Sequence, residues 1–316
     1  MRRVTVLLIS LLFISIGLLS GCFEEDKQQD ETDGYIQQLI NNASVGDTIN
    51  IPSGIYYEDV TVDKSIKLIG ENRETTIIDG SVEVKADGVN ISEFTIQNSQ
   101  GSGINISSNY NTIWNNNILN NHNGIMLINS NNNVISYNNI SNNIEWEGIV
   151  LAYSNNNVIS YNIISDNARD GMWLQYLSNN NTLYKNIVSN NGRHGIDLYS
   201  SSNDLVSDNN VSNNDNNGII IRVSSNNNTI KDNNLRNNRY GIEIKYYSDT
   251  FSVKNTIYNN NFIGNDQNAY DDCINTWDNG SAGNYWDDYT GIGDVPYNIS
   301  GGDNQDLYPL MNQADI

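Results

Sequence analysis

Three side chains capable of acid–base chemistry stand at one recurring position of this sequence. Glu147, Asp170 and His194 each precede a glycine, and these glycines are spaced 23 and 24 residues apart. Two carboxylates at a suitable separation can hydrolyse a glycosidic bond. A carboxylate, an imidazole and a nearby cation can also move a proton beside a sugar carboxylate, as lyases and epimerases require. The three residues are therefore the candidate catalytic residues of the chain.

Cationic and aromatic residues lie close to these three in the sequence and are candidates for binding a ligand. The candidate binding residues are Trp146, Arg169, Trp173, Tyr184, Arg193 and Asp197. The alternative interpretation is that charged residues collect here because turns are exposed, and Asp-Gly and His-Gly are ordinary turn sequences. The pattern leaves enzymatic activity open and favours binding over catalysis.

The elements that must position these residues belong to a repeated phrase. It reads Gly-Ile-x-Leu, then a run of Ser and Asn, then two Asn-x-Ile segments. The copies begin at Gly103, Gly124, Gly148, Gly171, Gly195, Gly218 and Gly241. Each copy holds three short β-type segments separated by Asn-rich turns and has no room for a helix. A fixed period of this kind predicts an all-β solenoid, a parallel β-helix with one turn of chain per repeat.

Stacking of the copies predicts columns of identical side chains. The Ile and Leu of each Gly-Ile-x-Leu phrase are expected to point inward and form aliphatic columns, with rungs about 4.8 Å apart. Two Asn positions are expected to form side-chain ladders in the turns. The first comprises Asn111, Asn133, Asn157, Asn181, Asn203 and Asn228, and the second Asn116, Asn138, Asn162, Asn186, Asn209, Asn233 and Asn260. The last copy is expected to lose the first ladder, because residues 246–250 replace its Ser/Asn run.

The regions outside the repeats divide the chain into five segments. Residues 1–21 read as an export signal, with two arginines before an apolar run, and residues 22–34 as an acidic tether. Residues 35–102 are expected to form a cap and the first irregular rungs, opening with an amphipathic helix over residues 35–47. Residues 103–265 are the regular repeats, and residues 266–316 are a C-terminal capping module whose aromatic residues close the end of the core.

Two long stretches resemble a known family. The segment IQQLINNASVGDTINIPSG and the residues after it are similar to the opening of right-handed parallel β-helix proteins, including the NosD-like family and carbohydrate-binding or sugar-hydrolase β-helices. Residues 274–310, with WDNG, GNYW, GIGD and YPL, resemble the tail of NosD-like surface proteins. The resemblance implies a single-stranded right-handed parallel β-helix with a short N-terminal capping helix and an irregular C-terminal cap. It says little about chemistry.

The start of the chain also resembles a lipoprotein signal. Leu19-Ser20-Gly21-Cys22 matches the lipobox pattern, which implies lipid on Cys22 after cleavage before it. The alternatives are an uncleaved membrane anchor or a plain signal cut elsewhere. If Cys22 carries lipid, Cys273 has no cysteine partner within the chain.

Acidic residues of the C-terminal module form a candidate metal site. Asp271, Asp272, Asp287, Asp288 and Asp294 could gather around a hard cation such as calcium. The alternative, which we favour, is a solvated acidic cap with turn-forming aspartates. No cofactor is expected to be required. Copper is not expected, because its ligands are His, Cys and Met, and these are few and far apart here.

The net charge limits the partners. At a formal charge of −21 the chain repels polyanions, so a nucleic-acid partner is not expected. The sequence predicts a lipid-anchored protein on the outer face of the cytoplasmic membrane that binds or scaffolds an extracellular polymer, above all carbohydrate, with the membrane as a second partner through Cys22. The alternatives are a polysaccharide hydrolase, lyase or epimerase, and a purely structural envelope protein.

Overall fold

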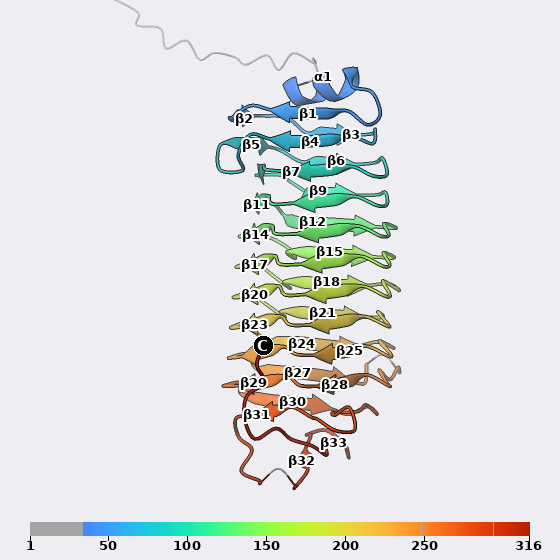
Figure 1. Cartoon of the computed structure of the whole chain (residues 1–316), viewed down its shortest axis with the longest axis vertical. Helices are drawn as coiled ribbons and strands as arrows, with labels where there is room; N and C mark the ends of the chain where they lie inside the picture. The colour runs from blue at the N-terminus through green and yellow to red at the C-terminus, as the bar shows by residue number, and fades with distance from the viewer. Residues whose placement is uncertain (1–33, 248, 293) are drawn as a thin grey trace, which may run out of the picture. The chain divides into compact units, whose positions relative to one another are not determined.

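The computed structural model describes residues 34–247, 249–292 and 294–316. These residues form a right-handed parallel β-solenoid of about ten turns, as the repeat predicts (Figure 1). Each turn gives one strand to each of three parallel sheets, called A, B and C in the order in which a turn visits them. None of the helices in the described part is long and apolar enough to cross a bilayer. The predicted signal of residues 1–21 and the predicted tether of residues 22–34, apart from Gly34, lie outside the described residues.

The strands of each sheet follow one another without a change of order. Sheet A contains β1 (Thr48–Ile51), β4 (Lys67–Gly70), β7 (Asn90–Ser92), β10 (Thr112–Trp114), β13 (Val134–Ser136), β16 (Val158–Ser160), β19 (Thr182–Tyr184), β22 (Leu205–Ser207), β25 (Thr229–Lys231) and β28 (Thr256–Tyr258). Sheet B contains β2 (Gly54–Tyr56), β5 (Thr76–Asp79), β8 (Thr95–Gln97), β11 (Asn117–Leu119), β14 (Asn139–Ser141), β17 (Ile163–Ser165), β20 (Ile187–Ser189), β23 (Asn210–Ser212), β26 (Asn234–Arg236), β29 (Asn261–Ile263) and β31 (Tyr285–Trp286). Sheet C contains β3 (Val60–Val62), β6 (Val82–Val84), β9 (Ser102–Ile106), β12 (Asn123–Ile128), β15 (Ile149–Ala152), β18 (Met172–Gln175), β21 (Ile196–Tyr199), β24 (Asn217–Arg222), β27 (Tyr240–Lys245) and β30 (Gln267–Asp271).

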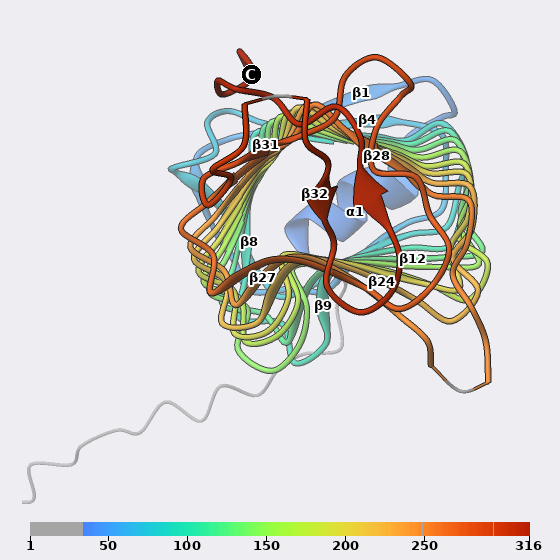
Figure 2. The same cartoon turned by 90° about the horizontal axis from the view of Figure 1, so that it is seen from below.

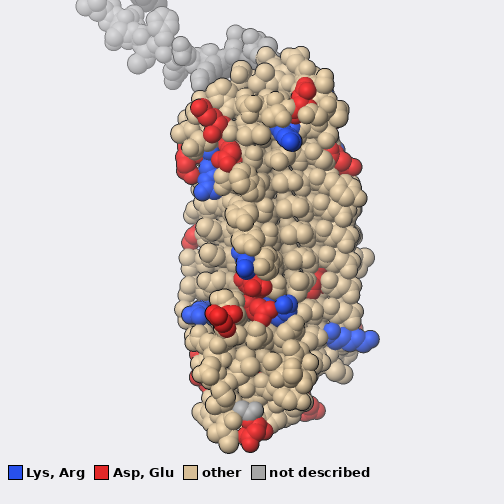
Figure 3. All heavy atoms as spheres, in the orientation of Figure 1, with Lys and Arg blue, Asp and Glu red and all other residues tan. Residues whose placement is uncertain are grey.

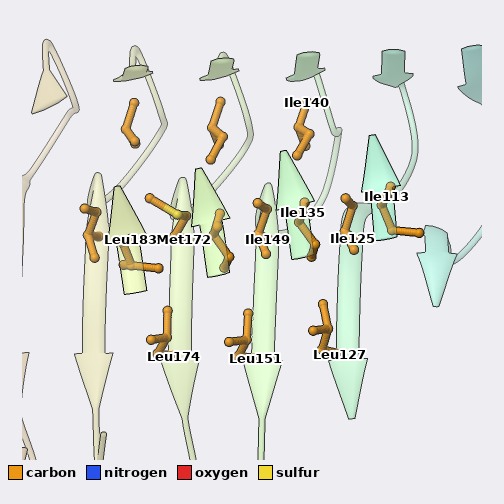
Figure 4. Close-up of a cluster of buried hydrophobic side chains, with 14 of the residues drawn as sticks. Ile113, Ile125, Leu127, Ile135, Ile140, Ile149, Leu151, Met172, Leu174 and Leu183 are labelled. Carbon is orange, nitrogen blue, oxygen red and sulfur yellow. The ribbon is translucent and has the colours of Figure 1, made fainter. Parts of the chain in front are cut away.

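The interior is made of aliphatic columns in strict register. In sheet C, Ile125 pairs with Ile149, which pairs with Met172, and Met172 pairs with Ile196. All four side chains are fully buried, and Figure 4 shows the first three, Ile125, Ile149 and Met172, side by side on adjacent strands. The predicted inward columns are therefore confirmed. Because every strand adds its side chains to the same columns, apolar burial stabilises the stack continuously along its axis.

Asparagine ladders hold the turns. In the second predicted ladder, the Oδ1 atom of Asn162 accepts hydrogen bonds from the backbone nitrogen of Asn138 at 2.9 Å and from its Nδ2 at 3.0 Å. Asn162 makes the same two bonds to Asn186. A third ladder, which we did not predict, runs through Asn121, Asn143, Asn167, Asn191, Asn214, Asn238 and Asn265. Each ladder satisfies backbone and side-chain polar groups that the turns would otherwise bury without partners.

Two predictions about the first ladder are wrong. Asn203 is exposed, and Asp204 takes its place, accepting a hydrogen bond from the backbone nitrogen of Asn181 at 2.7 Å. The ladder also continues beyond the last repeat, because the Oδ1 atom of Asn255 accepts from the backbone nitrogen of Asn228 at 2.8 Å. The spacing between ladder residues of adjacent turns changes by one residue at Asp204 and by three at Asn255. A prediction from near-constant spacing therefore misses both positions.

Both ends of the described stack are closed by apolar side chains. Helix α1 (Tyr35–Asn42) is shorter than the predicted 35–47 and lies across one end, with Ile36 and Ile40 fully buried (Figure 2). At the other end, the Trp286 ring stacks on Phe262 with centroids 4.2 Å apart. Beyond it, the short antiparallel pair β32 (Tyr297–Asn298) and β33 (Gln305–Asp306) crosses the opening. Both caps shield the aliphatic columns from water.

Replacing Asp204 with Asn tests the ladder. Burial raises the pKa of Asp204 to about 7 from an ordinary value of 3.8. Because the pKa is higher in the folded state, protonation of Asp204 favours folding, and this contribution to the free energy of unfolding is fully present below about pH 4. The contribution is lost as the pH rises through about 7. Asp204→Asn should remove this loss and stabilise the protein at pH 8 by on the order of 1 to 4 kcal/mol relative to wild type.

Urea unfolding of both proteins at pH 5 and pH 8 measures the effect. The exposed Asp215→Asn is the charge-matched control and should change little. Equal effects of the two substitutions at pH 8 would show that the ladder position carries no special cost.

Candidate functional site

The three candidate catalytic residues occupy one turn position of consecutive rungs. The backbone nitrogen of Gly148 donates to the carbonyl oxygen of Asp170 at 3.0 Å, and that of Gly171 donates to the carbonyl oxygen of His194 at 2.9 Å. The next residue in this column is Asn217. The column lies where the chain enters sheet C, so its side chains stand at one edge of that sheet.

Close packing explains why each column residue is followed by glycine. A Cβ atom on Gly171 would lie 2.5 Å from Cγ1 of Val188 and 2.7 Å from the carbonyl oxygen of Gly195. The side-chain amide of Asn191, from the third ladder, would lie 2.9 Å away. Only glycine fits this approach without displacing the neighbouring rung. The glycine therefore fixes where the preceding side chain begins.

His194 is a neutral hydrogen-bond donor in this arrangement. Its Nδ1 atom accepts a hydrogen bond from the backbone nitrogen of Asn217 at 3.3 Å. Burial, together with the nearby Arg193 and Arg222, lowers the pKa of His194 to about 3. The proton of the neutral ring therefore sits on Nε2, because Nδ1 faces a donor. A ring in this state can donate to a ligand oxygen but is poorly placed to accept a proton.

Asp170 is a buried carboxyl group with competing neighbours. Its Oδ1 atom accepts from the backbone nitrogen of His194 at 3.0 Å, and its Oδ2 atom lies 3.4 Å from Nη1 of Arg193. Burial and the neighbouring Asp197 raise its pKa to about 7, although Arg193 opposes the shift. Burial also raises the pKa of Glu147. Both side chains are almost fully buried, since Asp170 is 0% exposed and Glu147 is 2% exposed.

A bidentate ion pair lies in the middle of sheet C. Asp197 on β21 is fully buried, and its carboxylate accepts from Nε of Arg222 at 3.2 Å and from Nη2 at 2.6 Å. Burial raises the pKa of Asp197, and the guanidinium group of Arg222 opposes that shift. Such a planar pair is geometrically specific. It holds the Arg222 head group flat against the outer surface of the sheet.

Aromatic rings surround this ion pair. Trp173 on β18 is the register partner of Asp197 and meets Tyr199 edge to face, with centroids 6.4 Å apart. The guanidinium carbon of Arg222 lies 5.2 Å from the centroid of Tyr199. At the edge of the sheet, the guanidinium carbon of Arg169 lies 3.9 Å above the Trp146 ring. These contacts are cation–π interactions, which engage the flat face of each guanidinium group, and Arg222 also engages its N–H edge with Asp197.

We call this surface of sheet C the charged face. It comprises Trp146, Glu147, Arg169, Asp170, Trp173, Arg193, His194, Asp197, Asn217, Arg222 and Glu243. Figure 3 shows acidic and basic side chains gathered over the later rungs of this side, separated by rungs almost free of charge from a second group over the first rungs. Tyr199, Arg222 and Glu243 were missed at the sequence level. Glu243 occupies the same x position of Gly-Ile-x-Leu as Trp173 and Asp197, which is the signal that could have found it.

Of the six buried side-chain polar atoms without a hydrogen-bond partner among the described residues, four lie on or beside the charged face, and the other two are the Oδ1 atoms of Asn90 and Asn105. The four are Oε1 of Glu147, Nε1 of Trp173, Oε1 of Gln175 and Oδ1 of Asn217. Buried polar groups are rarely left unpaired in proteins, and each costs about 1–3 kcal/mol. Their concentration here marks the charged face as a place where the protein alone does not complete its hydrogen bonding.

Tyr184, which was grouped with Trp173 among the candidate binding residues, does not lie on the charged face. Tyr184 ends β19 in sheet A, whereas Trp173 lies on β18 in sheet C. Its ring meets Tyr161 edge to face at 5.6 Å, and Tyr161 stacks on Tyr137 at 4.9 Å. Tyr184 lies in the second strand of its repeat, and the strands of one turn face different directions.

The five candidate metal ligands do not form one group. Asp271 is fully buried and accepts hydrogen bonds from Nε1 of Trp277 at 2.9 Å and from the backbone nitrogen of Cys273 at 2.9 Å. Asp287 and Asp288 instead share the Nδ2 donor of Asn268, at 2.9 and 3.0 Å. Asp272 accepts from the backbone nitrogen of Tyr246, and Asp294 is exposed. No three His, Cys, Asp or Glu side chains gather to hold a metal anywhere in the described ranges.

Comparison with known proteins places the chain in a family. A family model described as periplasmic copper-binding protein (NosD) matches residues 144–291, and one described as right handed beta helix region matches residues 60–205. The chain is a NosD-like right-handed β-helix protein. A search of curated proteins found no significant match.

Solved structures share the fold at low sequence identity. The A-module of the Azotobacter vinelandii mannuronan C-5 epimerase AlgE6 is 16% identical with a TM-score of 0.66, over 79% of this chain and 78% of that one. An alginate lyase from Paenibacillus sp. str. FPU-7 is 16% identical with a TM-score of 0.54, over 79% and 89%. Tailspike protein 2 from Escherichia coli O157:H7 bacteriophage CAB120 is 14% identical with a TM-score of 0.61, over 85% and 43%. Identities this low show the fold alone.

Copper, which the family description names, does not fit the residues of this NosD-like chain. Copper prefers His, Cys and Met ligands. His194 uses Nδ1 to accept from Asn217, and His122 Nδ1 faces Glu145 at 3.5 Å. Cys273 lies in the C-terminal cap, hydrogen-bonded to Asp271. These side chains do not converge, so we derive no role for copper.

Removal of Arg222 tests the ion pair beneath the charged face. Arg222→Ala should lower the free energy of unfolding by about 3–5 kcal/mol, because it leaves the fully buried Asp197 without a counter-charge. Lys245→Ala is the control, because its pair with Glu243 at 3.5 Å is half-exposed and should contribute about 0–1 kcal/mol. Urea unfolding at pH 7 measures both, and equal losses would contradict the assigned role of the pair.

Proposed function

We propose that this protein is exported and binds an extracellular polysaccharide across the charged face of sheet C. The family description supports export, because it names a periplasmic protein. The named activities of the fold relatives support a carbohydrate partner, because an epimerase of mannuronan and a lyase of alginate are built on the same solenoid. A long parallel sheet also offers a straight surface to an extended polymer.

The observation that carries the proposal is the set of unpartnered polar atoms. Oε1 of Glu147 and Oδ1 of Asn217 need donors, and Nε1 of Trp173 needs an acceptor. Sugar hydroxyls both donate and accept, so one ligand class can satisfy all three. Arg193 and Trp173 are only partly buried, and small rotations of side chains on this face would bring a ligand within reach of these atoms.

We propose binding rather than cleavage because of the state of the acid–base residues. Asp170 and Glu147 lie beneath other side chains, and His194 presents a donor rather than a proton acceptor. A general base must come within hydrogen-bond reach of the proton that it removes. Their best-supported role is to orient the arginines and the backbone around a bound polymer.

Two tryptophans of equal exposure on different sheets test the location. Trp146→Ala should weaken polysaccharide binding by roughly tenfold, because it removes the platform of Arg169 at the edge of the charged face. Trp114→Ala is the matched control on sheet A, since Trp114 is 41% exposed and Trp146 39%. Binding is measured on a panel of immobilised neutral and acidic polysaccharides. A loss caused by Trp114→Ala alone would move the site to sheet A, and no binding by the wild type would reject the function.

We further propose that lipid on Cys22 holds the protein at the outer face of the membrane. The proposal rests on the lipobox-like Leu19-Ser20-Gly21-Cys22, which lies outside the described residues. Cys22→Ser should move the protein from the membrane fraction to the soluble fraction, and mass spectrometry of the wild-type N-terminus should find an acylated cysteine. The control is Cys273→Ser, which leaves the signal intact. A Cys22→Ser protein that stays in the membrane fraction would contradict lipid anchoring.

A further inference from the structure

The charged face carries a column of arginines, each two residues before the glycine of its repeat. The backbone nitrogen of Arg193 donates to the carbonyl oxygen of Arg169 at 3.2 Å, and that of Asn216 donates to Arg193 at 2.7 Å. The backbone nitrogen of Arg239 then donates to Asn216 at 2.8 Å. Arg169, Arg193 and Arg239 therefore stand in one line along the solenoid axis, with rungs spaced about 4.8 Å apart. We call this line the arginine column.

A second line of cations follows the opposite edge of the same sheet. Arg222 at the end of β24 is the register partner of Lys245 at the end of β27. The two lines flank the outward side chains of β18 to β27. Four of the eight arginines in a chain of net charge −21 therefore border one face. Arg193 and Arg222 are paired with Asp170 and Asp197, and Lys245 with Glu243, so the cations at this face without an acidic partner in the described ranges are Arg169 and Arg239. Cations left unpaired on one face of an acidic protein indicate a local surface for negative charge.

The outer members of the arginine column have no carboxylate partner among the described residues, and the one side-chain hydrogen bond of Arg239 runs from its Nη1 to Oδ1 of Asn216 at 3.4 Å. Arg169 and Arg239 are exposed, and neither forms an ion pair with any described residue. Arg169 stacks on Trp146 at 3.9 Å, and Arg239 stacks on Tyr240 at 5.5 Å. Stacking uses the flat face of a guanidinium group, so N–H groups of its fork stay accessible at these two exposed side chains. That fork matches the two oxygens of a carboxylate or a sulfate.

We infer that the polysaccharide bound at this face is anionic and carries carboxylate or sulfate groups that the arginine column pairs with along the chain. This inference rests on the proposed polysaccharide-binding function and names its ligand class. The column places Arg169 and Arg193 on neighbouring rungs and Arg239 two rungs beyond Arg193, so an extended polymer with repeated acidic groups meets more than one guanidinium group at once. The Asp197–Arg222 pair keeps the middle of the face neutral, so the free arginines at the edge provide the attraction.

The test removes the two unpaired arginines without disturbing a buried pair. Arg169→Gln with Arg239→Gln keeps hydrogen-bonding capacity and removes two charges. The control, Lys185→Gln with Arg236→Gln, removes the same charge from sheets A and B, and Lys185 likewise stacks on a ring, that of Tyr184 at 5.2 Å. Binding of the wild type and both double variants is measured against dextran sulfate, polygalacturonate and neutral dextran, at low and high salt.

The wild type should bind dextran sulfate or polygalacturonate and not neutral dextran, with affinity that falls as salt rises. The arginine variant should lose roughly tenfold or more in affinity, and the control should stay within about twofold of wild type. Preference between the two probes identifies sulfate or carboxylate as the recognised group.

Other results separate the failure of this inference from that of the proposed function. Binding of neutral dextran, or of neutral glycans on the wider panel, without binding of the acidic probes overturns the inference and leaves polysaccharide binding standing. Absence of binding to any polysaccharide overturns both. Equal losses of affinity in the two double variants also overturn the inference, and so does equally tight binding of single-stranded DNA. Either result would show that the attraction is general to polyanions and not located in the arginine column.

Discussion

Rung-to-rung register is the constraint on which the rest of this structure depends. Parallel strands of only a few residues make few hydrogen bonds each, so their alignment must be enforced elsewhere. The asparagine ladders provide it, because each side-chain amide binds the corresponding amide and backbone of the next turn. Glycine at the entrance to sheet C then allows the turns to approach closely. Columns of like residues follow from these two devices, and the charged face is built from such columns.

Much of the fold could be predicted because it repeats. The inward Ile and Leu positions and the second Asn ladder recur at nearly constant spacing, and the structure confirms both. The predictions failed where the spacing changed: Asp204 replaced Asn203, and Asn255 continued a ladder expected to end. A pattern of residue types at nearly constant spacing does not detect a one-residue shift. In the structure, the ladder position belongs to the residue whose side chain reaches the adjacent turn and forms the hydrogen bond.

The site was harder to predict than the fold. Sequence spacing placed Glu147, Asp170 and His194 in successive rungs, because they share a position relative to glycine. It could not give their protonation states, which depend on burial and on Nδ1 of His194 facing a backbone donor. It also grouped Trp173 with Tyr184, since closeness along the chain does not show on which of three sheets a side chain stands. Arg222 was missed because its partner, Asp197, lies 25 residues earlier.

The stacking of whole turns has a consequence for how such a surface can change over evolution. Each turn gives one residue to every column, so one turn can be duplicated or lost while the apolar interior and the ladders on either side remain continuous. The bordering cations would then move relative to one another by one rung, in discrete steps. A solenoid of this kind can match its row of charges to a new polymer period by changing the number of turns between two arginines, with no redesign of the core.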